Sequence, residues 1–500
     1  MNDPTLKKDP IGFDIAVGVA LAAAYRGLFL LLAPRVIDSA DSIQYIEVAR
    51  HFAAGDFVGF YARIPLLYPA LCAFLSFFVN DFEWAGIAVS LVASSLLVVP
   101  VYLIARDMQG RRMARVATLI VVIWPWLVDY GCRVAPEALA SLFWFSGIYF
   151  LVLALRRGHI WTILAPVTFF ALHLTRPEGT ILMLAAPLIA LILLDRRDDE
   201  IRPWRLAPVA LISMFLLAVY AMYMMEVTGE PTLNSRMPDT QTAVLHTLFR
   251  QGEAFIRTFI KLFGEVLPTM LGPYLLLFAG VGLFVPSYLR RDLRLELVLV
   301  SFAILQFAAA VYSTFPEPRY IMPVTIAAIL WSSRGLLLVA DQAHRLKQWR
   351  ALRAAPVGLL VLMMLLGLAV NVVPHYLGRM SYQPVEYKIA GRWMKENLEP
   401  GLIMSRKPQV GFYADMPTTG PEPTDTIDQI LKRAKEAGAK YLVVDERYST
   451  GMIPALKPLL VPENAPSALK LLKDNLSPYR QARIVIYAFK DADTGRGGRL

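Results

Sequence analysis

Charged residues are scarce in this sequence. Asp, Glu, Lys and Arg make up 18% of its 500 residues, whereas a soluble globular protein carries about 25%. The shortage is concentrated in long apolar runs between residues 12 and 373, and such runs indicate a multi-spanning membrane protein. The net charge of +10 does not indicate nucleic-acid binding, because the basic residues cluster in short loops between apolar runs, where they set membrane orientation.

Phosphate-binding and metal-binding motifs are also missing. The chain contains no GxxxxGK loop and no complete GxGxxG, which argues against an ATP-driven pump. Its two cysteines and six histidines form no ligand cluster and no HExxH. We therefore expect no cofactor and no nucleic-acid partner, and the residues do not support a divalent-metal site.

Eleven apolar segments are expected to span the membrane. They cover residues 12–34, 84–105, 114–131, 138–155, 160–174, 180–194, 206–225, 266–289, 295–314, 320–338 and 356–373. Every second connecting loop is rich in Arg and Lys, and basic loops stay in the cytoplasm. This alternation predicts a cytoplasmic N-terminus. The outer-facing pieces are then 35–83, 131–137, 175–179, 226–265, 315–319 and the chain after 374.

Two apolar or amphipathic segments are assigned to outer loops rather than to spans. Counting Leu66–Val79 as a span would invert every later basic loop, so we predict a re-entrant or interfacial helix there. The alternative is that it spans and another weak segment does not. The stretch Thr242–Leu262 has helical periodicity and would cover a cavity or lie on lipid.

The first outer loop carries a polar stretch, Ile37–Tyr45, with the carboxylates Asp38 and Asp41. Apolar residues behind it recur at helical spacing and predict a helix at the membrane interface. They are Ile43, Ile46, Ala49 and Ala53. Asp41 has two interpretations. It is either a functional acid or a helix cap, since Gln44 follows three residues later, as in a capping box.

Four outer loops, the first included, deliver charged residues to one face. They contain Arg63, then Arg133 with Glu137, then Arg176 with Glu178, and finally Glu317 with Arg319. Each has a structural alternative, because an acid after proline suits a first helical turn and arginines at span ends reach for the interface. So many polar groups on one side nevertheless favour a shared wet cavity.

The pattern changes after Val373. Helices are predicted at Val385–Asn397, Thr424–Ala437 and Ala465–Asn475, and strands at Leu402–Ser405, Lys440–Asp445 and Gln481–Phe489. This alternation predicts a small α/β domain with a largely parallel sheet. The expected organisation is an all-α polytopic membrane domain over 1–374, an α/β soluble domain over 375–490 and a disordered tail over 491–500.

These motifs, in this order, resemble the GT-C superfamily of integral-membrane glycosyltransferases, above all its bacterial family-39-like and aminoarabinose-transferase-like members. The matching stretches are Asp41–Gly55, Arg63–Pro69, Glu137, Arg176–Gly179 and Pro318–Pro323. The resemblance covers roughly residues 12–340. Many members carry two adjacent acids in the first outer loop, whereas Ser42 follows Asp41 here, which argues against a bound metal.

The resemblance implies an inverting hexosyl- or pentosyltransferase of the cell inner membrane. It would move a sugar from a polyprenyl-phosphate donor to a hydroxyl of a lipid, protein or polysaccharide acceptor on the periplasmic side. Asp41 would be the general base, and Glu137 would orient the acceptor or hold an arginine. The leaving phosphate would be stabilised by Arg176, Arg319 and Arg63. The further substrate-binding residues expected are Tyr45, Arg133, Glu178 and Tyr320.

Three alternatives remain at this point. A transporter or flippase of lipid-linked saccharides would also bind phosphate with arginines, but it should show inverted repeats, and the sequence shows no repeat. The second is a polymerase or ligase that uses a diphosphate-linked donor. The third is a structural membrane protein whose periplasmic domain recruits partners.

Overall fold

The computed structural model describes residues 11–32, 36–59, 64–193, 203–229, 233, 252–284, 293–313, 315–345, 383–474 and 482–490. The chain divides into two compact units. Unit 1 comprises Met1–Leu31 and Val48–Tyr376, and unit 2 comprises Leu32–Glu47 and Leu377–Leu500. The first boundary falls near the end of α1 (Ile11–Leu32), and the second falls inside α2 (Ala40–Ala53). The stretch that carries Asp41 therefore belongs to the same unit as the C-terminal sheet.

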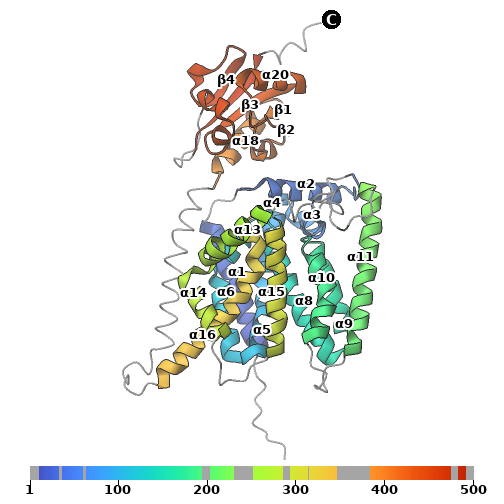
Figure 1. The fold of residues 1–500 in the computed structure, drawn as a ribbon. Helices are drawn as coiled ribbons and strands as arrows, with labels where there is room; N and C mark the ends of the chain where they lie inside the picture. The colour runs from blue at the N-terminus through green and yellow to red at the C-terminus, as the bar shows by residue number, and fades with distance from the viewer. Residues whose placement is uncertain are drawn as a thin grey trace, which may run out of the picture. The chain divides into compact units, whose positions relative to one another are not determined.

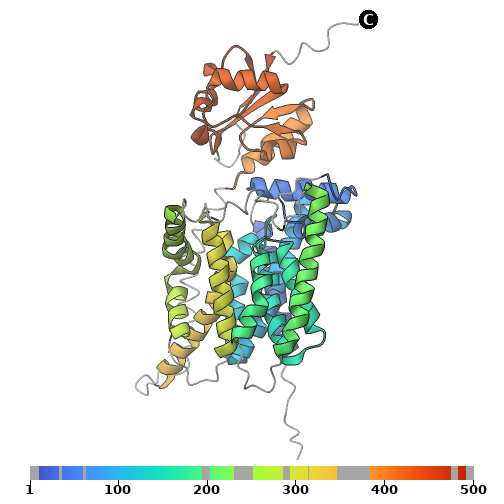
Figure 2. The ribbon, with the colours of Figure 1, turned by 45° about the vertical axis from the view of Figure 1, so that its right-hand side comes forward.

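Every regular element in the described part of unit 1 is a helix (Figures 1 and 2). After α1 and α2 come α3 (Leu67–Val79), α4 (Phe82–Leu96), α5 (Val98–Gln109), α6 (Arg111–Ile123), α7 (Pro125–Tyr130) and α8 (Glu137–Arg157). They are followed by α9 (Trp161–His173), α10 (Gly179–Leu193), η1 (Pro203–Arg205) and α11 (Leu206–Thr228). The last are α13 (Gly252–Lys261), η2 (Leu262–Val266), α14 (Leu267–Phe284), α15 (Leu293–Tyr312), η3 (Pro318–Ile321) and α16 (Met322–Arg345).

Seven of these helical segments are long and apolar enough to cross a membrane, α4 and α5 counting together as Phe82–Gln109. They match seven expected spans, and the shorter helices α9 and α10 match two more. The expected span 114–131 is instead two short helices, because Trp124 is extended and Pro125 starts α7. The expected span 356–373 lies outside the described residues, so the number eleven is not confirmed.

Helix α3 is as short as α9, so its length does not decide between a re-entrant helix and a span. It has 13 residues and is therefore about 20 Å long, against roughly 30 Å for the hydrocarbon core. The second half of the expected outer loop 226–265 is helical and continuous with the next expected span. There α13 runs through the π-helical η2 into α14, which gives one apolar helical stretch, Gly252–Phe284. The rest of Thr242–Leu262 lies outside the described residues.

Helices α14 and α16 make a close crossing that fixes the helix downstream of Arg319. A Cβ atom on Gly282 would lie 1.9 Å from the Trp331 carbonyl oxygen, and one on Gly335 would lie 1.9 Å from that of Phe278. Only glycine permits backbones this close, as in small-residue helix pairs of membrane proteins. The crossing holds α16, and therefore η3 before it, against the bundle.

Unit 2 contains a five-stranded sheet of order β2-β1-β3-β5-β4. Its strands are β1 (Leu402–Met404), β2 (Thr418–Thr419), β3 (Ala439–Asp445), β4 (Leu469–Asp474) and β5 (Ile484–Phe489). Its helical segments are α18 (Val385–Asn397), α19 (Gln409–Ala414), α20 (Ile427–Ala437), α21 (Ser449–Met452), η5 (Pro454–Leu460) and η6 (Pro462–Asn464). Alternate residues of β3 enter two cores, one with α18 and α19 and the other with α20 and η5. The sheet is therefore covered on both faces.

The α/β prediction for this domain holds, with two corrections. The sheet is mixed rather than largely parallel, because β5 pairs antiparallel with both β3 and β4. The segment Ala465–Asn475 is not a helix but contains β4. Its register shifts between Leu471 and Lys473, and Leu469 packs into one core while Leu472 packs against the other. Pairing along β5 thus outweighs the helix propensity of Leu and Lys.

Candidate functional site

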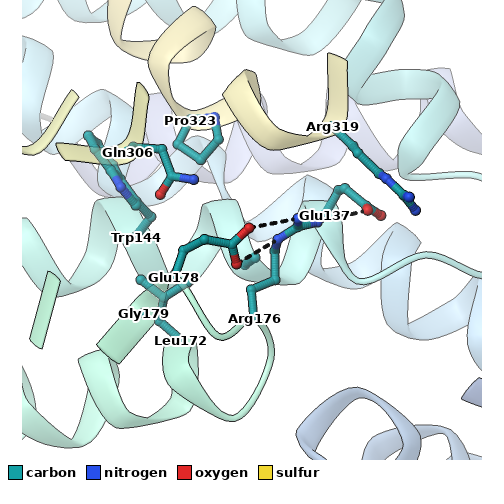
Figure 3. Close-up of a pocket in the computed structure, with 10 residues that line it drawn as sticks. Glu137, Trp144, Leu172, Arg176, Glu178, Gly179, Gln306, Arg319 and Pro323 are labelled. Carbon is teal, nitrogen blue, oxygen red and sulfur yellow. Dashed lines mark hydrogen bonds and ion pairs between the residues drawn. The ribbon is translucent and has the colours of Figure 1, made fainter. Parts of the chain in front are cut away.

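The centre of the candidate site in unit 1 is Arg176, in the turn between α9 and α10 (Figure 3). Its Nη1 donates to Glu137 Oε1 at 3.0 Å, and its Nη2 donates to Glu178 Oε1 at 3.0 Å. Its side chain is 11% exposed, and that of Glu137 is 3% exposed. Burial alone would lower the pKa of Arg176, but Glu178 and Glu137 raise it overall. The structure therefore brings together three residues that the sequence singled out.

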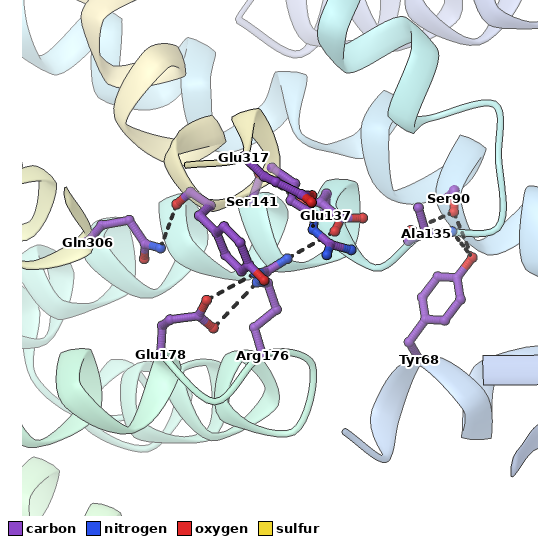
Figure 4. A network of polar contacts seen from close by, with 11 residues as sticks. Tyr68, Ser90, Ala135, Glu137, Ser141, Arg176, Glu178, Gln306 and Glu317 are labelled. Carbon is purple, nitrogen blue, oxygen red and sulfur yellow. Dashed lines mark hydrogen bonds and ion pairs between the residues drawn. The ribbon is translucent and has the colours of Figure 1, made fainter. Parts of the chain in front are cut away.

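A tyrosine links this cluster to the other arginine. The guanidinium carbon of Arg176 lies 4.9 Å from the centre of the Tyr320 ring, and that of Arg319 lies 5.2 Å from it. Both distances suit a cation–π contact. Arg319 also pairs with Glu317 at 2.8 Å, and Gln306 donates to the Tyr320 carbonyl oxygen at 3.0 Å (Figure 4). Two loops that are far apart in sequence, 174–178 and 315–321, thus meet at one aromatic ring.

A small cavity adjoins the cluster. It is lined by Glu137, Ala140, Trp144, Leu172, Arg176, Glu178, Gly179, Gln306, Arg319 and Pro323. Its volume is about 10 Å³, which holds roughly one water molecule. Two buried atoms of its lining, Glu137 Oε2 and Trp144 Nε1, have no hydrogen-bond partner among the described residues. Buried polar groups usually have a hydrogen-bond partner, so these two atoms are exceptions within the lining.

The loop before α8 is fixed from one side by Tyr68 (Figure 4). The Tyr68 hydroxyl donates to the Gly86 carbonyl oxygen at 2.8 Å and accepts from the Ala135 N–H at 2.8 Å. Ser90 Oγ lies 2.9 Å from this hydroxyl and donates to the Ala135 carbonyl oxygen at 2.9 Å. Ala135 lies two residues before Glu137. The network therefore fixes the backbone from which the Glu137 side chain extends.

Tyr68→Phe is expected to lower the free energy of unfolding by about 1–3 kcal/mol, because it leaves the buried Ala135 N–H without its acceptor. Thermal unfolding of the purified protein in detergent would measure the change. Tyr274→Phe is the matched control, since Tyr274 is 47% exposed. Equal melting temperatures for the two variants would contradict the structural role of the Tyr68 hydroxyl.

Arg133 lies beside the cluster but not in its cavity lining. It makes a short ion pair with Asp129, and its guanidinium carbon is 4.5 Å from the centre of the Tyr130 ring. Both contacts are to residues of α7. Arg63, the remaining predicted phosphate ligand, lies outside the described residues.

Asp41 and Tyr45 belong to unit 2, and the structure removes one interpretation of Asp41. Helix α2 begins at Ala40, so Asp41 lies within its first turn. The Asp41 N–H donates to Ser39 Oγ at 3.2 Å, which is the hydrogen bond of an N-cap residue. Ser39 therefore caps the helix, and Asp41 does not. The predicted stripe is confirmed at Ile43, Ile46 and Ala49, which are all buried.

Several site residues escaped the sequence analysis. Gln306 and Trp144 lie inside apolar spans, and Ser90 and Tyr68 hold the loop before Glu137. A lone glutamine in an apolar run was a usable signal, because polar residues at membrane depth tend to be functional. No group of three or more His, Cys, Asp or Glu side chains that could hold a metal ion occurs among the described residues.

Comparison with known proteins supports the resemblance to GT-C glycosyltransferases that the sequence shows. Residues 64–225 match the family described as dolichyl-phosphate-mannose-protein mannosyltransferase. No curated protein matches the chain. Among solved structures, ArnT from Cupriavidus metallidurans bound to undecaprenyl phosphate superposes with a TM-score of 0.60 at 16% identity, covering 98% of this chain and 100% of that one.

Two other solved structures share the fold. The oligosaccharyltransferase of Archaeoglobus fulgidus, tethered to an acceptor peptide, gives a TM-score of 0.58 at 14% identity, covering 89% of this chain and 70% of that one. The arabinofuranosyltransferase AftD from Mycobacteria gives 0.52 at 15% identity, covering 95% and 40%. By their descriptions, two of the three structures are an oligosaccharyltransferase and an arabinofuranosyltransferase. The resemblance predicted from the sequence is confirmed: this chain is a multi-pass membrane protein with a GT-C-like fold.

Proposed function

We propose that this protein is a glycosyltransferase that uses a polyprenyl-monophosphate sugar as its donor and transfers the sugar, with inversion, to an acceptor hydroxyl. The observation that carries the proposal is the buried Arg176–Glu137–Glu178 cluster within a GT-C-like fold. Buried charges that come from separate loops and adjoin a cavity with unsatisfied polar atoms are typical of functional sites in membrane proteins.

In the proposed reaction, the acceptor oxygen bonds to the anomeric carbon while the bond from that carbon to the phosphate oxygen breaks. Asp41 takes the proton of the hydroxyl as general base. The electron pair leaves with the polyprenyl monophosphate, whose charge Arg176 and Arg319 stabilise. Arginine suits this role because its guanidinium can donate two parallel hydrogen bonds to one phosphate. Arg63 is retained as a third proposed phosphate ligand, and Tyr45 and Arg133 as further substrate-binding residues.

A phosphate can bind at the cavity only if it displaces a carboxylate that is already paired with an arginine. Arg176 and Arg319 are both paired with glutamates, namely Glu137, Glu178 and Glu317. The cavity also holds no more than about one water molecule. We propose that the donor phosphate replaces the Glu178 carboxylate at Arg176, and that Glu137 keeps the guanidinium oriented during the exchange. Tyr320 would hold both guanidinium groups toward the same ligand.

A transporter or flippase of lipid-linked saccharides is the second candidate, since it would also bind a phosphate through arginines. The two candidates differ in product. Membranes that contain the protein should be incubated with labelled polyprenyl-phosphate mannose, glucose, galactose or arabinose in the presence of envelope material. Release of free polyprenyl monophosphate from at least one donor supports the transferase. No release from any of these donors, with movement of one donor between leaflets, supports the flippase.

The acceptor side of the reaction is proposed to be periplasmic, with the N-terminus in the cytoplasm of an inner-membrane protein. Arg111 and Arg115 lie in one of the basic loops expected in the cytoplasm, but both pair with Asp14. A substitution there would break an ion pair, so Arg157 is the better probe of the cytoplasmic side. Cys72 and Cys132 are buried and should give little background.

Arg157→Cys should therefore resist a membrane-impermeant thiol reagent added from the outside, whereas Lys432→Cys should react. The Lys432 side chain is 77% exposed, so a cysteine at this position is accessible to the reagent. Labelling of intact spheroplasts, with detergent-lysed samples as the control for reactivity, measures both. The opposite labelling pattern would contradict the proposed orientation.

A further inference from the structure

Two residues of the C-terminal domain contact the backbone just before Asp41, all within unit 2. The Ile37 N–H donates to the Tyr413 hydroxyl at 2.8 Å, and Gln409 Nε2 donates to the Asp38 carbonyl oxygen at 3.3 Å. These contacts join segments that are 376 and 371 residues apart in sequence. Ile37, Gln409 and Tyr413 are 3%, 1% and 9% exposed, so water competes little for these bonds.

The two contacts come from one face of one helix. Gln409 and Tyr413 are four residues apart on α19, and residues at this spacing lie side by side on a helix. The two contacts hold the backbone of segment 37–41 at Ile37 and Asp38, just ahead of α2. The conformation of this segment, and with it the position of the Asp41 carboxylate, therefore depends on where α19 lies.

Helix α19 is itself firmly seated in unit 2. A Cβ atom on Gly411 would lie 1.8 Å from Thr418 Oγ1 on β2, and one on Gly391 in α18 would lie 2.5 Å from Tyr413 Cβ. The Lys388 amine lies 5.0 Å from the centre of the Tyr413 ring. Packing this close leaves α19 little freedom to shift, so it is a rigid support for the segment.

We propose that Tyr413 and Gln409 are positioning residues for the Asp41 base, and that the C-terminal domain is therefore part of the catalytic apparatus. This inference rests on the proposed function, in which Asp41 removes the acceptor proton. A displacement of about 1 Å in a catalytic group can cost about a hundredfold in rate. A loss of the Tyr413 hydroxyl should therefore act on turnover rather than on donor affinity.

The test uses the full-length protein with labelled polyprenyl-phosphate sugar. Tyr413→Phe keeps the packed ring and removes the acceptor of the Ile37 N–H. It should lower kcat by about tenfold, with the donor KM within about twofold of wild type. Tyr441→Phe is the matched control. Its hydroxyl donates to the Glu399 carbonyl oxygen at 2.8 Å, in the same domain but away from segment 37–41, and kcat should stay within about twofold.

Two further readouts separate positioning from a general loss of stability. Amide hydrogen exchange in a peptide that covers residues 36–41 should be faster in Tyr413→Phe and unchanged in Tyr441→Phe. Gln409→Met removes the second contact and should also lower kcat, and the double variant should cost less than the product of the two single effects, because both act on one segment.

The outcomes distinguish this inference from the proposed function. If the wild-type protein transfers sugar and Tyr413→Phe matches Tyr441→Phe in kcat, the positioning role is wrong and the proposed function stands. If the wild type transfers no sugar, the proposed function fails and the positioning role falls with it, even where exchange confirms the docking. Normal kcat for Gln409→Met and Tyr413→Phe together would also overturn the inference.

Discussion

Asp41→Asn is expected to lower the rate of sugar transfer by about 100-fold to 10,000-fold, the usual contribution of a general base. Asparagine has nearly the same size as aspartate but cannot accept a proton at neutral pH. Expression and donor binding should stay normal, because the variant keeps the first turn of α2 and Ser39 performs the cap. Initial rates with a labelled polyprenyl-phosphate sugar, at matched protein levels, measure the loss.

Ser39→Ala is the matched control for this prediction. It removes the cap at a cost of about 1 kcal/mol in stability but leaves the Asp41 carboxylate in place, so its effect on transfer should be below tenfold. Near wild-type transfer by Asp41→Asn would show that the base lies elsewhere. Asp38 and Glu137 would then be the next acids to substitute.

Arg176→Lys and Arg319→Lys are each expected to lower transfer by at least about tenfold, on the order of 1.4 kcal/mol of transition-state stabilisation. Lysine keeps the positive charge but loses the planar fork that grips a phosphate. The larger loss is expected at Arg176, whose guanidinium donates to two carboxylates at once. Lysine is preferable to alanine here, because Arg176→Ala would leave buried Glu137 unpaired, at about 3–5 kcal/mol.

The double variant gives the sharper test of a shared phosphate. If Arg176 and Arg319 stabilise one group, the two substitutions together should cost less than the sum of their separate effects. Arg205→Lys is the control, since Arg205 donates to the carbonyl oxygens of Leu155 and Arg156, at the end of α8 remote from Glu137. Full transfer activity in both single Lys variants would contradict the phosphate assignment of Arg176 and Arg319.

The helices with the clearest local signals could be predicted from the sequence. Residues 138–155 and 206–225, for example, fall within helices that are long and apolar enough to span a membrane. The first part of the stretch Gly252–Phe284 could not be predicted as part of a span, because it is amphipathic and resembles a surface helix. Only its continuation through η2 shows that it joins α14. Strand β4 escaped for a related reason, since its pairing with β5 involves residues distant in sequence.

Part of the candidate site could be predicted, because its residues also have a clear local signal. Charged residues in outer loops stand out against apolar spans, and Glu137, Arg176, Glu178, Arg319 and Tyr320 do gather in unit 1. The sequence could not show that Arg176 and Arg319 already form ion pairs with glutamates. Nor could it show that Tyr413 and Gln409, more than 370 residues away, contact the segment before Asp41.

One measurement tests the central claim most directly. Purified protein in liposomes should be given labelled polyprenyl-phosphate sugar together with envelope acceptor material, and the free polyprenyl monophosphate and the labelled acceptor should be counted in the same sample. The two products are expected to appear in equal amounts with the wild type and to be lost with Asp41→Asn. Movement of intact donor across the bilayer, with neither product formed by the wild type, would contradict a glycosyltransferase.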